Sequence, residues 1–181
     1  MTPDAEKPAE TPWQGKFLAI RQQGRWEYAE RVGKVSGVVI LAIDEEDHVL
    51  LIDQYRVPID RRCLELPAGL VGDESEGETP KAAGARELEE ETGYRAEQVE
   101  NLGVFCSSPG MVSECFTLLR ASGLTRVGEG GGVSDEDIAV RRVPLARIED
   151  EVAEARAQGL AIDVKLLLLL GAGMLAGATR A

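Results

Sequence analysis

One acidic segment, residues 86–94, constrains this chain of 181 residues more tightly than any other. It reads Arg-Glu-Leu-Glu-Glu-Glu-Thr-Gly-Tyr, and the residues around it predict a helix. Thr79 is a suitable N-cap, Pro80 suits the first helical position, and Gly93 suits the left-handed residue that ends a helix. We therefore expect a helix that begins near Pro80 and stops before Gly93.

Three carboxylates share one face of the expected helix. Glu87, Glu90 and Glu91 stand at positions i, i+3 and i+4, which places their Cβ atoms about 5–6 Å apart. Like charges at this spacing destabilise a helix by roughly 0.2–0.5 kcal/mol. A hard divalent cation removes that repulsion, because Mg²⁺ prefers carboxylate oxygens, water and phosphate. The alternative is a solvated acidic face, which most glutamate runs form, and spacing alone leaves both interpretations open.

The acidic segment belongs to a longer pattern of a glycine, five residues, a glutamate, seven residues and then Arg-Glu-apolar-any-Glu-Glu-any-Gly-apolar. The fixed positions are all occupied here, by Gly72, Glu78, Arg86, Glu87, Leu88, Glu90, Glu91, Gly93 and Tyr94. This pattern resembles the Nudix box. The resemblance implies an α/β/α sandwich with a mixed sheet. It also implies hydrolysis of a nucleoside diphosphate linked to another group, with Mg²⁺ or Mn²⁺ held by the glutamates of this helix.

An Ala-Gly pair precedes the pattern. In the ADP-ribose pyrophosphatase branch of the family, such a pair supplies the box glycine and a metal-binding backbone carbonyl. By resemblance, Ala68 provides the carbonyl and Gly69 is the counterpart of the box glycine, followed by a loop three residues longer than usual. On the literal pattern that glycine is Gly72, and both alternatives stay open. Arg86 is expected to orient the glutamates through ion pairs.

Two short segments outside the pattern resemble substrate-binding parts of the same branch. Arg56 ends a Gln-Tyr-Arg stretch after an apolar strand, and a guanidinium offers a planar fork for phosphate oxygens. The alternative for Arg56 is an ordinary ion pair with Asp53 or Glu65, and Glu65 is itself assigned to the substrate side. Pro109 and Gly110 lie in a Ser-Pro-Gly context fifteen residues beyond the pattern. That offset is typical of ADP-ribose pyrophosphatases and their nucleotide-sugar relatives.

The resemblance offers three candidates for the carboxylate that takes a proton from the attacking water. Glu136 follows a glycine-rich stretch at 127–134, which is expected to be mobile and in this branch can close over the site. Glu114 resembles a glutamate of the branch, and a loop salt bridge is its alternative role. Glu90 is the third candidate. Some relatives carry a glutamate two residues before the position of Glu136, where this chain has Ser134, so the identity of the base stays open.

Trp26 and Tyr28 alternate along an expected strand near the N-terminus. Either ring can stack on a nucleobase, pack against a neighbouring element or form a dimer contact. In related dimers this region helps to bind the nucleoside, so the resemblance also implies a homodimer.

Composition argues against several other classes of protein. A net charge of −12 disfavours nucleic acid or an anionic membrane surface as a partner. The single histidine, His48, argues against a His-dependent triad and a His-rich zinc site. The apolar run at 166–176 is shorter than the roughly 20 residues that span a bilayer. Three cysteines without a CxxC pair argue against a disulfide framework and for a reducing cytoplasm.

The order of elements predicts one α/β domain. Residues 1–12 are expected to form a disordered tail, 13–34 a small antiparallel strand region that contacts a second subunit, and 35–181 the Nudix domain. Strands at 35–43 and 48–55 are expected to pair as a hairpin. Further strands are expected at 16–20, 25–30, 103–106, 115–121 and 138–143, and helices at 145–158 and 163–175.

Together these observations predict metal-dependent hydrolysis of the pyrophosphate bond of ADP-ribose or a related nucleoside diphosphate sugar. The products would be a nucleoside monophosphate and a sugar phosphate. One alternative is the same chemistry on GDP-mannose or a dinucleotide, since the box recognises the pyrophosphate and not the base or sugar. The other is a catalytically silent Nudix-fold sensor of nucleotide sugars, which would have no chemical need of the intact glutamate set.

Overall fold

The apolar run expected as a buried strand forms β4 (Gly37–Ala42) at the centre of one sheet. The computed structural model describes residues 3–72, 77–133 and 136–178. In it β4 pairs antiparallel with β7 (Ala68–Leu70) and parallel with β9 (Cys115–Arg126). The strand β8 (Tyr94–Cys106) completes the sheet in the order β7-β4-β9-β8.

A second sheet has the order β10-β5-β6-β11. Its strands are β5 (His48–Arg56), β6 (Arg61–Glu65), β10 (Ile138–Pro144) and the short β11 (Ala161–Ile162). The expected hairpin of β4 and β5 is wrong, because the two strands share only the isolated bridge between Ile43 and Val49. Beyond that bridge they diverge into separate sheets, and each finds its ladder partners far along the chain. The turn at residues 44–47 is therefore a link between two sheets.

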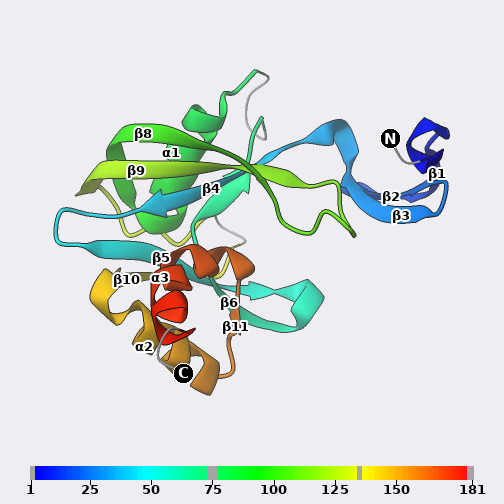
Figure 1. Ribbon diagram of the computed structural model, residues 1–181. Coiled ribbons are helices and arrows are strands. Elements are labelled where there is room, and N and C mark those ends of the chain that lie inside the picture. Colours follow the sequence, from blue (N-terminus) through cyan, green and yellow to red (C-terminus); the bar gives the residue numbers. More distant parts are fainter. Residues whose placement is uncertain (1–2, 73–76, 134–135, 179–181) are drawn as a thin grey trace.

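Helices cover both sides of this mixed β layer (Figure 1). The helix α1 (Pro80–Thr92) packs through Ala83 and Leu88 against Val38, Ile40 and Leu50. The helices α2 (Ile148–Ala157) and α3 (Leu167–Ala178) lie on the opposite side. A second core cluster joins them to the alternate strand residues Val39, Val49, Leu51 and Leu64. Successive strand residues thus serve opposite faces, as strand geometry requires, and the expected α/β/α sandwich is confirmed.

Single helical turns connect several of these elements. They are η1 (Pro3–Glu6), η2 (Val32–Lys34), η3 (Val57–Ile59), η4 (Leu145–Arg147) and η5 (Val164–Leu166). Within the described ranges, the structure contains no helix that is both long and apolar enough to cross a bilayer.

The predicted limits of α1 are confirmed. The hydroxyl of Thr79 accepts a hydrogen bond from the Ala82 N–H at 3.2 Å, Pro80 is the first helical residue, and Gly93 ends the helix with φ of 74°. The glycine-rich stretch then folds over this helix end. The N–H groups of Gly131 and Gly132 donate to the carbonyls of Glu91 and Glu90 at 2.8 and 3.0 Å. We expected a mobile stretch, but these bonds fasten it to the helix end.

The N-terminal region forms its own antiparallel sheet of β1 (Glu10–Gln14), β2 (Leu18–Gln23) and β3 (Trp26–Arg31), which projects to one side of the body (Figure 1). The hairpin of β2 and β3 around Gly24 is confirmed. The expectation of a disordered tail through residue 12 is wrong for the residues described, since η1 and β1 lie there. Asp4 is buried and pairs with Arg25 at 2.8 Å, which fixes η1 against the sheet.

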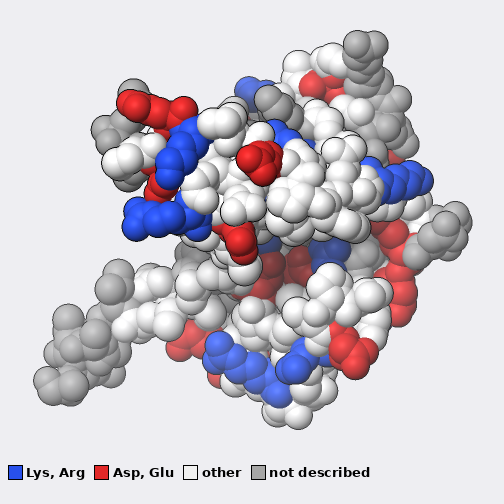
Figure 2. Space-filling view, turned by 90° about the vertical axis from the view of Figure 1, so that its right-hand side faces the viewer, with Lys and Arg blue, Asp and Glu red and all other residues white. Residues whose placement is uncertain are grey.

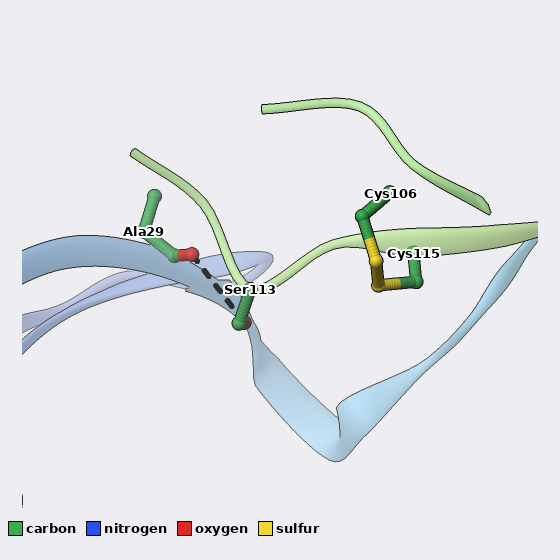
Figure 3. The surroundings of a disulfide bond; sticks show 4 residues. All are labelled: Ala29, Cys106, Ser113 and Cys115. Carbon is green, nitrogen blue, oxygen red and sulfur yellow. Dashed lines mark hydrogen bonds between the residues drawn. A yellow bond between two sulfur atoms is a disulfide. The ribbon is translucent and has the colours of Figure 1, made fainter. Parts of the chain in front are cut away.

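Two cysteines are paired, contrary to expectation. Cys106 and Cys115 stand opposite each other in the ladder of β8 and β9, and a disulfide joins them across a Cα–Cα distance of 4.0 Å (Figure 3). The bond closes the loop at 107–114, which contacts the N-terminal sheet through the Ser113 N–H and the Ala29 carbonyl at 3.0 Å. Cys63 is a buried free thiol. The cysteines therefore give no argument for a reducing compartment.

Candidate active site

A cleft of 430 Å³ opens where β4, β6, β7 and α1 meet. Figure 2 shows a hollow in the surface with acidic and basic side chains in its depth. The charged residues that line the cleft are Glu65, Glu87, Glu91, Glu114 and Glu136, together with Arg31, Arg56 and Lys165. The sequence predictions named all five of these carboxylates and Arg56, and the structure brings these six residues into one cavity.

The helix α1 presents Glu87 and Glu91, one turn apart, to this cleft. The N–H of Ala68 in β7 donates to Oε2 of Glu91 at 3.0 Å, so the strand and the helix are joined at the site. The Glu87 carboxylate lies over Gly69, where an added Cβ would stand 1.9 Å from Cδ of Glu87. Only glycine leaves room for the carboxylate in this position.

Burial raises the pKa of Glu91 to about 8, and the negative charges of Glu87 and Glu136 add to the shift against the opposing Ala68 N–H. Burial also raises the pKa of Glu87, although Arg86 opposes the change. A divalent cation would offset the cost of burying these two carboxylates side by side. Among the described residues no three acidic, histidine or cysteine side chains form a ready-made cage. Glu87 and Glu91 fit Mg²⁺, which keeps several waters and takes further oxygens from substrate phosphate.

Arg86 lies at the centre of an ion-pair cluster beside the cleft. Its guanidinium bonds to Glu78 at 3.2 Å, to Glu87 and Glu90 at 3.0 Å, and to the Leu70 carbonyl at 3.2 Å. Burial lowers the pKa of Arg86, but the surrounding carboxylates, Glu78 first, together raise it above its ordinary value. The arrangement supports the orienting role expected for Arg86. Glu90 is held in this cluster and does not line the cleft.

The two candidate positions favour glycine for different structural reasons. Gly69 provides the space beneath Glu87. Gly72 has a φ of +83° and donates its N–H to Oε2 of Glu78 at 2.9 Å. A left-handed backbone favours glycine at the second position, and a close contact requires it at the first.

Arg56 and Glu65 form a bidentate pair, with distances of 2.6 and 2.9 Å from Nε and Nη2 to the two carboxylate oxygens. Glu65 is almost fully buried, whereas the Arg56 side chain is 41% exposed toward the cleft. The hydrogen bond with Glu65 is the main cause of the raised pKa of Arg56. Both interpretations of Arg56 are thus compatible with the structure, because the buried glutamate fixes the guanidinium at the cleft wall.

Two candidate bases reach the cleft from loops. Glu114 pairs with Arg31 at 2.7 Å. Glu136 accepts a hydrogen bond from the Val133 N–H at 3.1 Å through Oε2. Each of these contacts involves only one oxygen of the carboxylate. Both residues line the cleft.

Four predicted substrate residues lie in a different place. Trp26, Tyr28, Pro109 and Gly110 line a second cavity of 360 Å³ between the N-terminal sheet and the 107–114 loop. The structure brings these four together but not into the main cleft. Glu114 belongs to the same loop and lines the main cleft, so the loop connects the two cavities.

The sequence predictions missed two positively charged residues of the cleft, Arg31 and Lys165. The Lys165 ammonium bonds to Asp163 at 2.6 Å and lies 6.0 Å from the centre of the Phe116 ring. Both residues reach the site from segments far along the chain from the acidic pattern. No local signal marks such residues, because only the tertiary fold brings them to the glutamates.

Comparisons with known proteins agree with this geometry. The NUDIX domain model matches residues 33–161, which is more than half of the chain. The chain is 38% identical over 122 residues to the methanol dehydrogenase activator of Bacillus methanolicus, an alignment that covers 67% of this chain and 64% of that protein. It is 33% identical over 123 residues to the ADP-ribose pyrophosphatase of Bacillus subtilis, covering 67% and 65%. The chain thus spans slightly less than two thirds of either relative.

A solved structure described as an ADP compounds hydrolase superposes with a TM-score of 0.67 at 25% identity, over 96% of this chain and 95% of that one. Its coverage includes the N-terminal sheet as well as the sandwich. From the domain match, the relatives and the shared architecture, we conclude that the chain belongs to the Nudix family.

Proposed function

We propose that the protein hydrolyses the pyrophosphate bond of a nucleoside diphosphate sugar, with ADP-ribose as the first candidate. The observation that carries the proposal is the meeting of Glu87 and Glu91 with Arg56 and Glu136 in one cleft. The names of the Bacillus subtilis relative and of the superposed structure support ADP-linked substrates.

Nudix hydrolases generally need divalent metal ions, and we propose Mg²⁺ or Mn²⁺ here. Glu87, Glu91 and the backbone carbonyl of Ala68 would hold the cation, with Glu90 close by on the same helix. When bound, the cation would neutralise charge that develops on the phosphate oxygens and would lower the pKa of the attacking water.

The positively charged side chains of the cleft bind the substrate. Arg56 offers its guanidinium to the phosphate oxygens while Glu65 holds it in place, and Arg31 and Lys165 extend the positive wall of the cleft. These contacts compensate for an overall charge of −12, which by itself would repel a phosphate ester.

Glu136 acts as the general base. It takes a proton from water as the water oxygen attacks one phosphorus atom and the bond from that phosphorus to the bridging oxygen breaks. The bridging oxygen leaves with the other phosphate, which gives a nucleoside monophosphate and a sugar phosphate. Comparing E136Q, E114Q and E90Q tests this assignment. The largest loss of kcat is expected for E136Q.

The second cavity is the proposed site of the nucleobase. Trp26 is 48% exposed and can stack on a purine, and Tyr28 lines the same cavity. We further propose a homodimer formed through the N-terminal sheet. Its exposed apolar residues include Trp13, Phe17 and Leu18, which are 57%, 69% and 44% exposed. Light scattering of the protein and of F17E tests the dimer, since a charge there would separate the subunits.

A regulatory role is the second candidate function. The Bacillus methanolicus relative is named as an activator of another enzyme, and a protein of this kind could bind a nucleotide sugar in the same cleft. Turnover distinguishes the two proposals. A sensor binds ADP-ribose without consuming it, whereas an enzyme releases AMP and ribose phosphate.

The decisive assay incubates the protein with ADP-ribose and Mg²⁺ and identifies products by chromatography. A panel with GDP-mannose and dinucleotides then ranks substrates. E91Q is expected to lose activity by about 100-fold or more, because it removes one cation ligand. E89Q is the matched control on the same helix, since Glu89 pairs with Arg95 at 2.8 Å outside the cleft. Binding without turnover in the wild type would favour the sensor.

A further inference from the structure

The segment that carries Glu136 is tied to the helix of the metal-binding glutamates. The N–H of Gly131 donates to the carbonyl of Glu91, and the N–H of Gly132 donates to the carbonyl of Glu90. Gly132 also lies against Glu136, because an added Cβ at Gly132 would stand 2.3 Å from Oε2 of Glu136. Through Gly132, one side of Glu136 is thus linked to the backbone of α1.

The residue after Glu136 is bound by an arginine from another strand. Arg62 in β6 reaches across β5 to the start of β10. Its Nη1 contacts Oδ2 of Asp137 at 2.6 Å, and its Nη2 donates to the Asp137 carbonyl at 3.2 Å. Because Asp137 is the next residue after Glu136, these bonds fix the backbone that carries the proposed base.

Arg62 cannot swing freely, because a buried carboxylate holds it. Asp53 in β5 is 5% exposed and accepts a hydrogen bond from Nε of Arg62, while its carbonyl accepts one from Nη2 at 2.5 Å. Arg141 also donates to Asp53, at 2.5 Å, and pairs with Glu151 of α2 at 2.7 Å. A buried charge is costly unless it is paired, so Asp53 fixes the orientation of Arg62.

The pair of Arg62 and Asp137 adds little to stability. The Asp137 side chain is 81% exposed, and ion pairs that are open to solvent contribute little to folding. Because Asp137 stands next to Glu136, the pair of Arg62 and Asp137 can have a role other than stability. Small displacements of a reacting group cost large factors in rate, whereas they cost little in folding.

We propose that Arg62 is a positioning residue, which holds Glu136 in the cleft through Asp137 while Asp53 anchors the guanidinium. The proposal rests on the proposed function, in which Glu136 takes the proton of water. Arg62 touches neither substrate nor cation. It sets the position of the base relative to the glutamates of α1.

Two substitutions separate this role from folding. D137A removes the carboxylate that Arg62 contacts and leaves Asp53 fully paired. R62K keeps a positive charge for Asp53, but one ammonium cannot span both aspartates as the guanidinium fork does. E100A is the matched control, because it breaks the exposed pair of Glu100 and Arg120, whose side chains are 56% and 55% exposed and lie away from the cleft.

Both D137A and R62K are expected to lower kcat for ADP-ribose by about 10- to 100-fold, with KM within about twofold of the wild type. The double variant should be no slower than the slower single variant, because both changes interrupt one connection. E100A should keep the wild-type kcat. A second readout is amide hydrogen exchange at Val133, whose N–H donates to Glu136. Exchange there should accelerate about tenfold or more in D137A and R62K, and not in E100A.

The outcomes are distinguishable. If E136Q lowers kcat while D137A and R62K match E100A in both kcat and exchange, Arg62 does not position the base and the inference is wrong. If E136Q retains full activity, the assignment of the base fails, and the inference fails with it. If the wild type splits no pyrophosphate, the proposed function fails. Exchange at Val133 still tests the anchoring, and unchanged protection overturns it.

Discussion

The carboxylate of Glu87 occupies the space that a side chain at Gly69 would need, since a Cβ there would stand 1.9 Å from Cδ of Glu87 and 2.0 Å from Oε1. One atom at position 69 therefore controls where a proposed metal ligand lies. The strand β7 sets the floor of the site, and the helix supplies the oxygens above it.

Gly69→Ala is expected to push Glu87 away and to lower kcat by about 100-fold, with weaker activation by Mg²⁺. Kinetics over a range of Mg²⁺ concentrations measures both effects. The matched control is Gly171→Ala in α3, where an added Cβ meets no atom within 4 Å. Equal activity of the two alanine variants would show that Glu87 can move without consequence.

Metal-free protein is expected to lose stability as pH rises. Glu91 has a folded-state pKa of about 8 against an ordinary value of 4.5, so its contribution is complete below about pH 4.5 and is lost as pH rises toward 8. The loss should be on the order of a few kcal/mol in the free energy of unfolding, measured by urea titration in EDTA. In Glu91→Gln this part of the slope should disappear, and Mg²⁺ should remove it from the wild type. A slope that is the same in Glu91→Gln and the wild type would contradict the burial argument.

Arg56→Met should leave Glu65 buried without its partner and cost about 3–5 kcal/mol in the free energy of unfolding. The double variant Arg56→Met with Glu65→Gln should recover much of that stability, because the buried charge is gone. It should not recover substrate binding, and its KM for ADP-ribose should stay about 10-fold or more above the wild type, the loss expected of a charge-assisted hydrogen bond. Denaturant titration and steady-state kinetics on the same samples separate the two effects. A wild-type KM in the double variant would remove Arg56 from the substrate site.

Reduction of the bond between Cys106 and Cys115 should lower the free energy of unfolding by about 2–3 kcal/mol, as expected for a closed loop of this length. Native protein without reductant should show no reactive thiol, because Cys63 is buried. The Cys106→Ser, Cys115→Ser double variant should be insensitive to reductant. Thiol titration with and without denaturant, combined with thermal unfolding, checks both statements, and two reactive thiols in the untreated protein would show the bond to be absent.

Local chemistry explains what the sequence could predict. The limits of α1 follow from Thr79, Pro80 and Gly93, which act within one or two turns, and the shared face of Glu87 and Glu91 follows from helical periodicity alone. The hairpin of β4 and β5 failed for the opposite reason. Strand partners are selected by packing across the whole domain, and nothing near the 44–47 turn shows that β4 pairs with β9.

The same limit applies to the site. The disulfide depends on the register of β8 against β9, which places Cys106 opposite Cys115 and cannot be read from cysteine spacing. Lys165 reaches the cleft, and Arg62 reaches Asp137, only because the fold brings distant segments together. Pro109 and Trp26 were both predicted to bind substrate, and the fold places them in a second cavity beside the N-terminal sheet and not in the main cleft.

The contact between the glycine-rich stretch and the end of α1 constrains the length of that loop. An added Cβ at Gly93 would stand 2.4 Å from the Gly128 carbonyl oxygen, and one at Gly130 would stand 2.4 Å from the backbone carbon of Thr92. Two main chains therefore touch without intervening side chains. Inserting or deleting a residue between Gly128 and Gly132 would change the position of β10 relative to the end of α1. New sequence intended to change the ligand of this protein should therefore be introduced outside residues 128–132.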